Sequence, residues 1–323
     1  MSVATKVGKR VIGLANYIIN TGILIVILLL LVLGCYALWD SRQVFASAGP
    51  EVYEKYKPTA ENGGLSFAEL QAINPDVCAW LTVYGTNIDY PVVQGKYNFE
   101  YINKNAEGKY SLAGSIYLEA KCSRDFSDFS SILHGHHMDK GVMFGDIEFF
   151  ADEEYFNARR YGTLYAAGRE QGLEFFIFAH VSAYNRAIYR NCITDPEDKQ
   201  DYLDLLYEAA MHTRTDVSVT VDDRIVLLST CSGVSTNGRD VLIGKIIDEV
   251  PKDPFATERP DRPELPTVDA LTNFWINAPL WAKIGMATAP FLLILLLAIL
   301  TIKKRKRKRA AKKQETTLNK GDG

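Results

Sequence analysis

Two side chains that could carry out nucleophilic chemistry, Cys231 and Arg239, lie eight residues apart in the last third of the sequence. Cys231 follows an apolar run of strand length, residues 225–230, and Arg239 precedes a second one, residues 241–247. The loop between them is rich in glycine, so a hairpin would place the thiol beside the guanidinium. A thiolate can attack a carbonyl while a fixed cation holds the oxygen that becomes negative. The same pattern also fits a buried structural cysteine and a surface arginine at a turn.

Three histidines, His134, His136 and His137, follow another short strand. A thiol nucleophile needs a proton partner that titrates near neutrality, and histidine is the usual one. Such a pair meets only in the fold, so a long separation in sequence is expected. Alternation along the strand puts His134 and His136 on the same side, so the local pattern leaves both as candidates. A metal site is not favoured, because Asp139 is the only adjacent carboxylate, and no metal or cofactor is predicted.

The sequence around these residues resembles the sortases, the membrane-anchored cysteine transpeptidases of Gram-positive bacteria. The likeness covers about residues 67–247, and two further segments resemble class B sortases in particular. Leu227 departs from the family, which usually has Thr at the start of its Thr-Leu-x-Thr-Cys motif. The segments that carry the resemblance are Leu228-Ser-Thr-Cys231 with Arg239 beyond it, Gly135-His136-His137-Met138 with Gly141-Val-Met-Phe144, Ile88-Asp-Tyr-Pro-Val-Val-Gln94-Gly-Lys-Tyr-Asn98, and Ala113-Gly-Ser-Ile-Tyr117.

The resemblance implies that the chain cleaves a C-terminal sorting motif of secreted proteins and transfers the protein to an amine of the cell wall precursor. Cys231 would form a thioacyl intermediate, His136 would donate a proton to the departing amine, and Arg239 would hold the substrate carbonyl. The resemblance thus selects His136 from the histidine cluster. Three residues are candidates for substrate binding: Asn98, which matches a polar residue of class B sites, Ser229 and Tyr189.

The remaining pattern predicts a mainly β fold with peripheral helices. The clearest long helix is predicted for residues 196–212, and a hairpin is expected to turn through residues 168–172. About eight strands favour a closed eight-stranded sortase-type β-barrel, flanked by N- and C-terminal transmembrane helices. The resemblance places the long helix between the sixth and seventh strands. The predicted strands are residues 77–83, 88–93, 115–118, 131–133, 163–167, 175–181, 225–230 and 241–247.

Two segments without charged residues, 11–39 and 284–302, are long enough to cross a bilayer. Basic residues precede the first and follow the second, so both termini are expected in the cytoplasm and the region between them outside. A cleaved signal peptide is the alternative for the first segment, because Ala46-Ser-Ala48 resembles a cleavage site. The expected organisation is 1–10 cytoplasmic, 11–39 anchor, 40–65 stalk, 66–250 catalytic domain, 251–278 extended spacer, 279–302 second span and 303–323 basic cytoplasmic tail, which would bind membrane lipid.

The outer region, residues 40–278, carries 22 basic and 37 acidic residues, a formal net charge of −15. This charge argues against nucleic acid as a partner. A pilin-polymerising sortase that joins subunits through a lysine amine is the runner-up, because a second span is unusual for class B. That class has an Asp-Pro-aromatic lid motif, but here Asp253-Pro-Phe255 follows the last strand. A hydrolytic thiol protease would need no added amine, and a non-catalytic surface-binding module would tolerate loss of Cys231.

Overall fold

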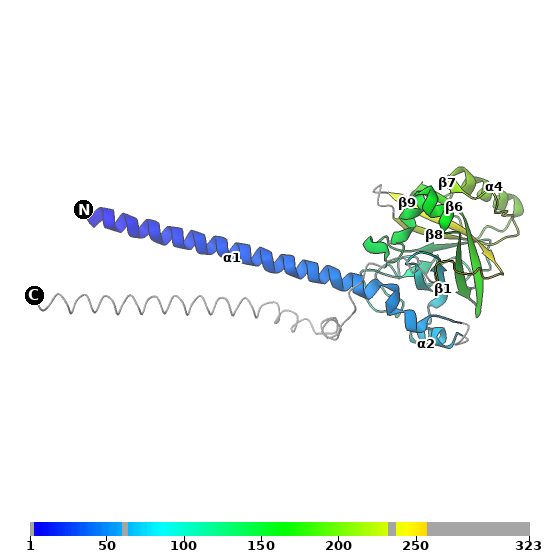
Figure 1. Ribbon diagram of the computed structural model, residues 1–323, viewed down its shortest axis with the longest axis horizontal. Coiled ribbons are helices and arrows are strands. Elements are labelled where there is room, and N and C mark those ends of the chain that lie inside the picture. The colour runs from blue at the N-terminus through cyan, green and yellow to red at the C-terminus, as the bar shows by residue number, and fades with distance from the viewer. Residues whose placement is uncertain (1–2, 60–63, 232–236, 257–323) are drawn as a thin grey trace, which may run out of the picture. The chain divides into compact units, whose positions relative to one another are not determined.

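Eight strands close into a barrel in the part of the chain that the structure describes (Figure 1). This computed structural model describes residues 3–59, 64–231 and 237–256, without the side chains of residues 3–10. The order around the barrel is β5-β1-β2-β3-β4-β8-β9-β6, and pairing of β5 with β6 closes it. The strands are β1 (Val77–Val83), β2 (Asp89–Val93), β3 (Ile116–Leu118), β4 (Ser130–His134), β5 (Tyr161–Ala166), β6 (Arg169–Ser182), β8 (Ile225–Cys231) and β9 (Gly238–Ile247). The predicted closed eight-stranded barrel is confirmed.

The barrel is mixed, with two parallel pairs among antiparallel ones. β2 pairs with β3 in parallel, and β4 pairs with β8 in parallel. The long helix α1 (Val3–Ala48) precedes the strands. Shorter helices and helical turns lie between the later elements: η1 (Pro50–Val52), η2 (Glu54–Tyr56), α2 (Leu65–Ile73), η3 (Asp139–Gly141), η4 (Gly145–Ala151), α3 (Glu153–Ala158) and α4 (Pro196–Glu208). The pairing of β4 with β8 brings the histidine segment next to the cysteine segment.

Two hydrophobic cores lie on opposite faces of β8. One cluster takes side chains from all eight barrel strands, Val226 and Leu228 of β8 among them, and so fills the barrel interior. The other joins Ile225 and Leu227 of β8 to Tyr202, Leu203 and Leu206 of α4 on the outer face. Burial on both faces explains why β8 reads as a continuous apolar run without alternation. Because side chains alternate along a strand, Ser229 and Cys231 share the outer face with Leu227.

The predicted long helix was too long. Helix α4 ends at Glu208, and Ala210–Thr213 form strand β7 instead, which pairs with β6 through Phe178↔His212. β5 covers the edge of β6 only as far as Glu174, so β7 pairs with the part beyond it. A free strand edge that needs hydrogen bonds therefore overrode local helical pattern. Figure 1 shows α4 beside β7 and β6, which agrees with the predicted place of the helix between the sixth and seventh strands.

The β5–β6 turn is also tighter than predicted. β5 ends at Ala166 and β6 begins at Arg169, so Ala167 and Gly168 alone form the loop. Both have positive φ, 50° and 78°. This conformation matches the twist of the two strands in a two-residue hairpin and favours glycine.

Helix α1 is the helix among the described residues that is long and apolar enough to cross a membrane. Within its segment Val11–Ala48, a stretch of 18 residues reaches a mean hydropathy of 2.8, although a signal sequence near the N-terminus would meet the same criteria. Ala46 and Ala48 at its end are buried against the barrel domain. The predicted second span, residues 279–302, lies outside the described residues.

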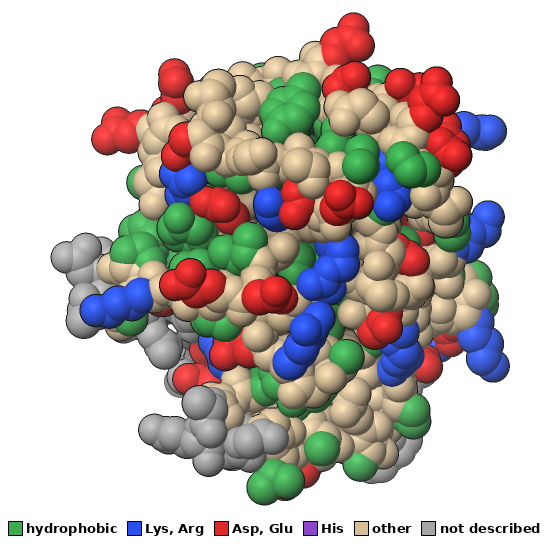
Figure 2. Space-filling view, turned by 90° about the vertical axis from the view of Figure 1, so that its right-hand side faces the viewer, with side chains coloured by type: hydrophobic (Ala, Val, Ile, Leu, Met, Phe, Trp, Pro, Cys, Tyr) green, Lys and Arg blue, Asp and Glu red, His purple; other side chains and the backbone are tan. Residues whose placement is uncertain are grey.

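The domain surface carries charges of both signs. Figure 2 shows acidic and basic side chains interspersed over one face, with hydrophobic side chains between them. Charges of both signs therefore lie close together on this face.

Candidate active site

Cys231 and Arg239 are direct neighbours across the β8–β9 ladder. Cys231 is the last residue of β8, and its register partner in β9 is Arg239, so the predicted hairpin pairing is observed. Cys231 is exposed, whereas Ser229 and Thr230 before it are buried. Arg239 donates from Nη1 to the carbonyl oxygen of Gly238 at 3.0 Å, which holds its guanidinium at the strand end.

His136 lies two residues after the end of β4, the strand that pairs with β8. Its Nε2 lies 2.9 Å from the carbonyl oxygen of Ile102. Because a carbonyl can only accept, Nε2 carries the hydrogen and Nδ1 is left for a second partner. Gly135 makes room for this segment, since a Cβ there would lie 2.7 Å from the ring of Phe144. This packing gives a physical reason for the glycine before the histidine and for the Phe144 that ends the following motif.

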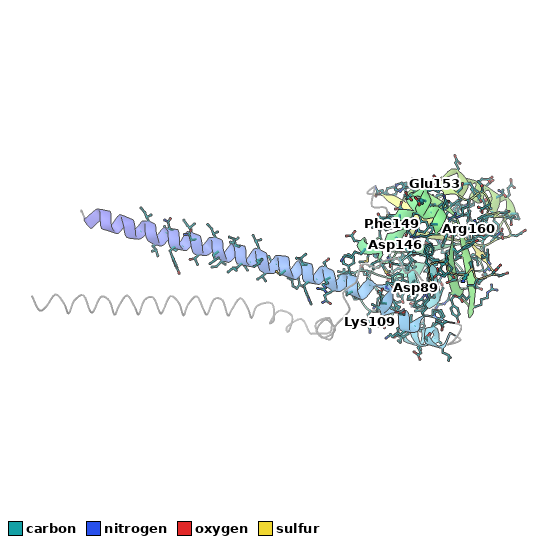
Figure 3. The ribbon with its side chains drawn as sticks, viewed as in Figure 1. Asp89, Lys109, Asp146, Phe149, Glu153 and Arg160 are labelled. Atoms are coloured by element: carbon teal, nitrogen blue, oxygen red, sulfur yellow. The ribbon has the colours of Figure 1, made fainter. Side chains whose placement is uncertain are left out.

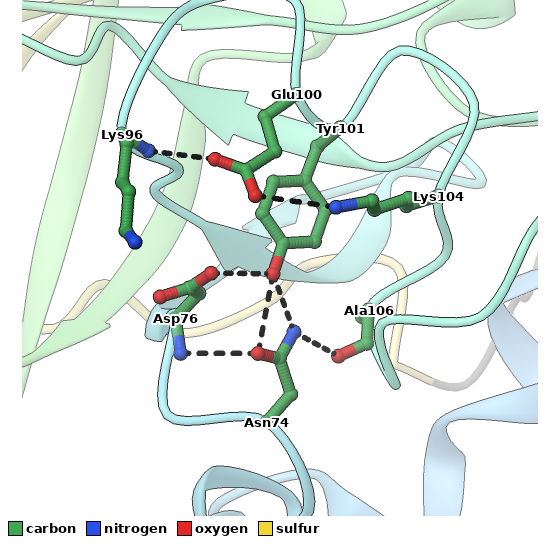
Figure 4. Close-up of polar contacts among 7 residues, drawn as sticks. All are labelled: Asn74, Asp76, Lys96, Glu100, Tyr101, Lys104 and Ala106. Atoms are coloured by element: carbon green, nitrogen blue, oxygen red, sulfur yellow. Dashed lines mark hydrogen bonds and ion pairs between the residues drawn. The ribbon is translucent and has the colours of Figure 1, made fainter.

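The loop between β2 and β3, residues 94–115, holds the carbonyl that orients the imidazole. Figure 4 shows the contacts that fix it. Tyr101 donates its hydroxyl to Asp76 Oδ2 at 2.7 Å and accepts from Asn74 Nδ2 at 2.9 Å. Glu100 accepts from Nζ of Lys104 at 3.2 Å. The residue that follows Tyr101 supplies the carbonyl, so this network positions the imidazole from outside the cavity.

Asp146 anchors the segment that follows the histidines. Its Oδ2 accepts from the backbone N–H of Asn87 at 2.7 Å and from Asn87 Nδ2 at 3.0 Å. Burial raises the pKa of Asp146, although the two Asn87 hydrogen bonds oppose the shift. Asp146, labelled in Figure 3, thereby ties η4 to the β1–β2 turn.

Glu119 is a partly buried carboxylate of the site that sequence reasoning missed. His134 Nε2 lies 3.0 Å from its Oε2, and Asn98 Nδ2 and Asn191 Nδ2 donate to its Oε1. Burial by itself would raise the pKa of Glu119, but the hydrogen bonds from His134 and Asn98 outweigh it and lower that pKa. Asn98 also accepts from the backbone N–H of Ala120 at 2.8 Å. Glu119 directly follows β3, and its place after a strand end was the only signal in the sequence.

Tyr189 and Ser229 contact each other near His134. The Tyr189 hydroxyl lies 3.0 Å from Ser229 Oγ. The ring of Tyr189 is 6.2 Å from that of His134, and the ring of Tyr117 is 5.2 Å from His134 on β4. Burial raises the pKa of Tyr189, while the Ser229 hydrogen bond opposes the shift. Tyr189 therefore remains a neutral hydroxyl group in the site.

One cavity of about 640 Å³ is lined by all six residues to which the sequence analysis gave a catalytic or substrate-binding role: Cys231, His136, Arg239, Asn98, Ser229 and Tyr189. Glu119 is the one acidic residue among the described residues that line it, and Arg186 and Arg239 are the cationic ones. The cavity thus has a carboxylate near β3 and guanidinium groups near β9 and after β6. The lining residues are Asn98, Phe99, Ile102, Tyr117, Glu119, His134, Gly135, His136, Ala183, Arg186, Tyr189, Ser229, Thr230, Cys231 and Arg239.

The other cysteines of the barrel domain do not line this cavity. Burial raises the pKa of both Cys78 and Cys122 to about 12, so these thiols stay protonated at neutral pH. Cys192 is exposed, and its thiol lies 3.5 Å from a backbone carbonyl oxygen. Cys231 alone among them shares a cavity with a histidine and an arginine.

The remaining histidines have partners outside the cavity. His137 lies at an ion-pair distance of 3.0 Å from Glu148, without hydrogen-bond geometry, and His180 Nδ1 lies 2.8 Å from Asp240. His212 Nε2 lies 2.7 Å from a backbone carbonyl oxygen. Within the described part of the chain, no group of three or more His, Cys, Asp or Glu side chains is arranged to hold a metal ion.

No protein-family model matches the sequence, but the chain is similar to several sortase B proteins and class B sortase structures. Sortase B of Staphylococcus aureus is 33% identical over 186 residues, 56% of this chain and 74% of that protein. The structure of sortase B from the type II pilus of Streptococcus pneumoniae is 46% identical, covers 57% of this chain and 99% of its own, and has a TM-score of 0.50. A class B sortase involved in pilus biogenesis in Streptococcus pyogenes is 36% identical, covers 57% of this chain and 98% of its own, and has a TM-score of 0.51.

Proposed function

Because the chain belongs to the class B sortases, which are cysteine transpeptidases, we propose that Cys231, His136 and Arg239 transfer the acyl group of a sorting motif to an amine. The observation that carries this proposal is the single cavity that the three side chains share. The register pair Cys231↔Arg239 supports it further. The substrate is a secreted protein with a C-terminal sorting motif.

In the first half of the reaction the Cys231 thiolate attacks a backbone carbonyl carbon of the motif. The carbonyl oxygen takes up the negative charge, and Arg239 holds it through charged N–H donors. Protonated His136 gives its proton to the nitrogen of the departing amine as the C–N bond breaks. A thioester on Cys231 and a neutral His136 remain.

In the second half an amine attacks the thioester carbon. Neutral His136 takes a proton from the attacking nitrogen, the C–S bond breaks with its electron pair on sulfur, and a new amide joins the two molecules. The chain is thereby returned to its thiolate and imidazolium state. This reaction needs no cofactor.

Two acceptor amines are candidates. An amine of the cell wall precursor fits the implied role of the family, and a lysine amine of a pilin is the second. The 46% identical relative comes from a type II pilus, and another relative is involved in pilus biogenesis, which favours the pilin amine as an alternative. The apolar helix α1 supports a membrane anchor that keeps the barrel domain outside the cell.

The proposal is tested by offering a library of sorting-motif peptides to the protein, with and without an amine acceptor, and identifying the products by mass. Cys231→Ala is expected to abolish cleavage, and Cys122→Ala, which removes a buried thiol outside the cavity, serves as the matched control. Hydrolysed product alone, with no amine adduct, would indicate a thiol protease. Full peptide binding and no cleavage by the wild type would indicate a binding module.

A further inference from the structure

The Glu119 carboxylate forms a fixed negative charge at one side of the cavity. Both of its oxygens accept hydrogen bonds, Oε2 from His134 and Oε1 from the amides of Asn98 and Asn191. The Asn98 amide cannot turn over freely, because its oxygen accepts from the backbone N–H of Ala120. The Glu119 side chain is only 15% exposed. Its position and its charge are therefore set by the protein and not by solvent.

His134 lines the cavity and forms a hydrogen bond with this carboxylate. Because its Nε2 faces the carboxylate, the hydrogen sits on Nε2 and Nδ1 keeps a lone pair. No described residue forms a hydrogen bond with Nδ1. The ring is packed between Tyr117 and Tyr189, with interplanar angles of 31° and 30°. The structure thus holds an imidazole with one unused acceptor nitrogen in the cavity wall.

The place of His134 relative to the nucleophile is set by strand register. His134 pairs with Ser229 in parallel, and Cys231 lies two residues beyond Ser229 on the same face. Two residues of strand span about 7 Å, so His134, which is level with Ser229, lies about that distance along the strand direction from Cys231. Arg239 lies on the other side of Cys231, on β9. The thiol is therefore flanked by a carboxylate–imidazole pair and by a guanidinium.

This separation of charge suits the two partners of the second half reaction. The carbonyl oxygen becomes negative and is stabilised by Arg239, whereas an acceptor amine arrives as a cation at neutral pH. An ammonium group is attracted to the anionic side of a cavity and repelled by its guanidinium side. It must also lose one proton before its nitrogen can attack, and neutral His136 takes up only the second proton.

We propose that His134 and Glu119 form the subsite for the acceptor amine. Nδ1 of His134 accepts a hydrogen bond from the incoming ammonium and takes its first proton, which leaves a neutral amine beside the thioester. The amine then attacks, His136 takes the second proton, and the C–S bond breaks. Protonated His134 returns its proton to water. Glu119 is the positioning residue, since it fixes the ring and stabilises the imidazolium.

The inference rests on the proposed transpeptidase function, so its test separates the two half reactions of the full-length protein in detergent. Wild type, His134→Phe and Glu119→Gln are first acylated with a sorting peptide in single-turnover reactions, and the thioester is followed by mass. The thioester is then left in water or given triglycine, Nα-acetyl-lysine amide or hydroxylamine. The first two amines are ammonium ions at the assay pH, whereas hydroxylamine is already neutral. Phenylalanine keeps an aromatic ring between the two tyrosines.

The ratio of aminolysis to hydrolysis is expected to fall at least about tenfold in both variants for triglycine or the lysine derivative, because a positioned proton acceptor contributes about 10²–10⁴ in rate. Which of the two amines loses more identifies the acceptor class. Hydroxylamine needs no first deprotonation, so its ratio is expected to stay within about threefold of wild type. His212→Phe is the matched control, because that imidazole also stacks on aromatic rings, Phe156 and Phe178, but lies outside the cavity.

An unchanged ratio for the ammonium acceptors would overturn the inference, and so would an equal loss with hydroxylamine, which would reduce the pair to a structural support. Loss of acylation alone would assign the pair to the donor peptide and would overturn it as well. If the wild type forms no thioester with any sorting peptide, the proposed transpeptidase function itself fails, and the inference with it.

Discussion

Gly114 lies near the end of the β2–β3 loop, against the carbonyl of the same loop that orients His136. It has φ of +62°, and a Cβ at this position would lie 2.5 Å from the carbonyl oxygen of Ile102 and 2.9 Å from that of Tyr101. The Ile102 oxygen is the one that accepts from His136 Nε2 at 2.9 Å. Gly114→Ala is therefore expected to displace the partner of the imidazole as well as to strain the backbone.

The size of both effects follows from the geometry. A left-handed alanine costs about 1–2 kcal/mol, and forcing the two carbonyls apart adds about 1–3 kcal/mol. For a domain of this size each kcal/mol lowers Tm by about 2–4 °C, so Tm should fall by roughly 4–20 °C. Displacement of a catalytic group by 1 Å can cost about 10²-fold in rate, so single-turnover acylation should slow by about 10–100-fold.

The matched control is Gly168→Ala. Gly168 has φ of +78°, and a Cβ there would meet nothing within 4 Å. This variant carries the same backbone cost without the clash, and Gly168 does not line the cavity. Thermal unfolding and acylation at a temperature well below both transitions are measured for the two variants. The reasoning is refuted if Gly114→Ala acylates at the wild-type rate, or if the two variants lose the same stability and the same activity.

Three further predictions concern charge and topology. Arg239→Lys is expected to slow acylation by about 10²–10³, because a point charge cannot reproduce a planar fork of donors; near-normal acylation beside normal thiol alkylation would reduce Arg239 to a charge. Glu119 has its pKa lowered below the ordinary 4.5, so its stabilisation is full above that pH and is lost as pH falls further. The difference in unfolding free energy between wild type and Glu119→Gln should therefore be constant above about pH 5.5 and shrink below pH 4.5, and a difference independent of pH would contradict it. Protease added to intact cells stripped of wall should cut near residue 260 and spare tags at both termini, and digestion of a C-terminal tag would contradict the two-span topology.

Two predictions from local pattern were wrong, the end of helix α4 and the length of the β5–β6 turn, and in both cases strand pairing decided the outcome. Residues 210–213 continue the pattern of α4, yet they form β7 because β6 offers an edge that β5 leaves uncovered. The turn between β5 and β6 closes with two residues, since Ala167 and Gly168 both adopt positive φ. Neither the free edge nor the register that creates the tight turn is written in a short window of sequence.

The sequence by itself determined the barrel class and the pairing of Cys231 with Arg239. Both depend on local information, since apolar runs mark strands buried on both faces and a glycine-rich loop returns the chain as a hairpin. Only the tertiary structure decided how the two candidate histidines differ. Nε2 of His136 faces the carbonyl of Ile102, whereas His134 faces Glu119, and these partners come from segments 34 and 15 residues away. Side-chain alternation places both histidines on one face, so their different partners depend on contacts between distant segments that only folding brings together.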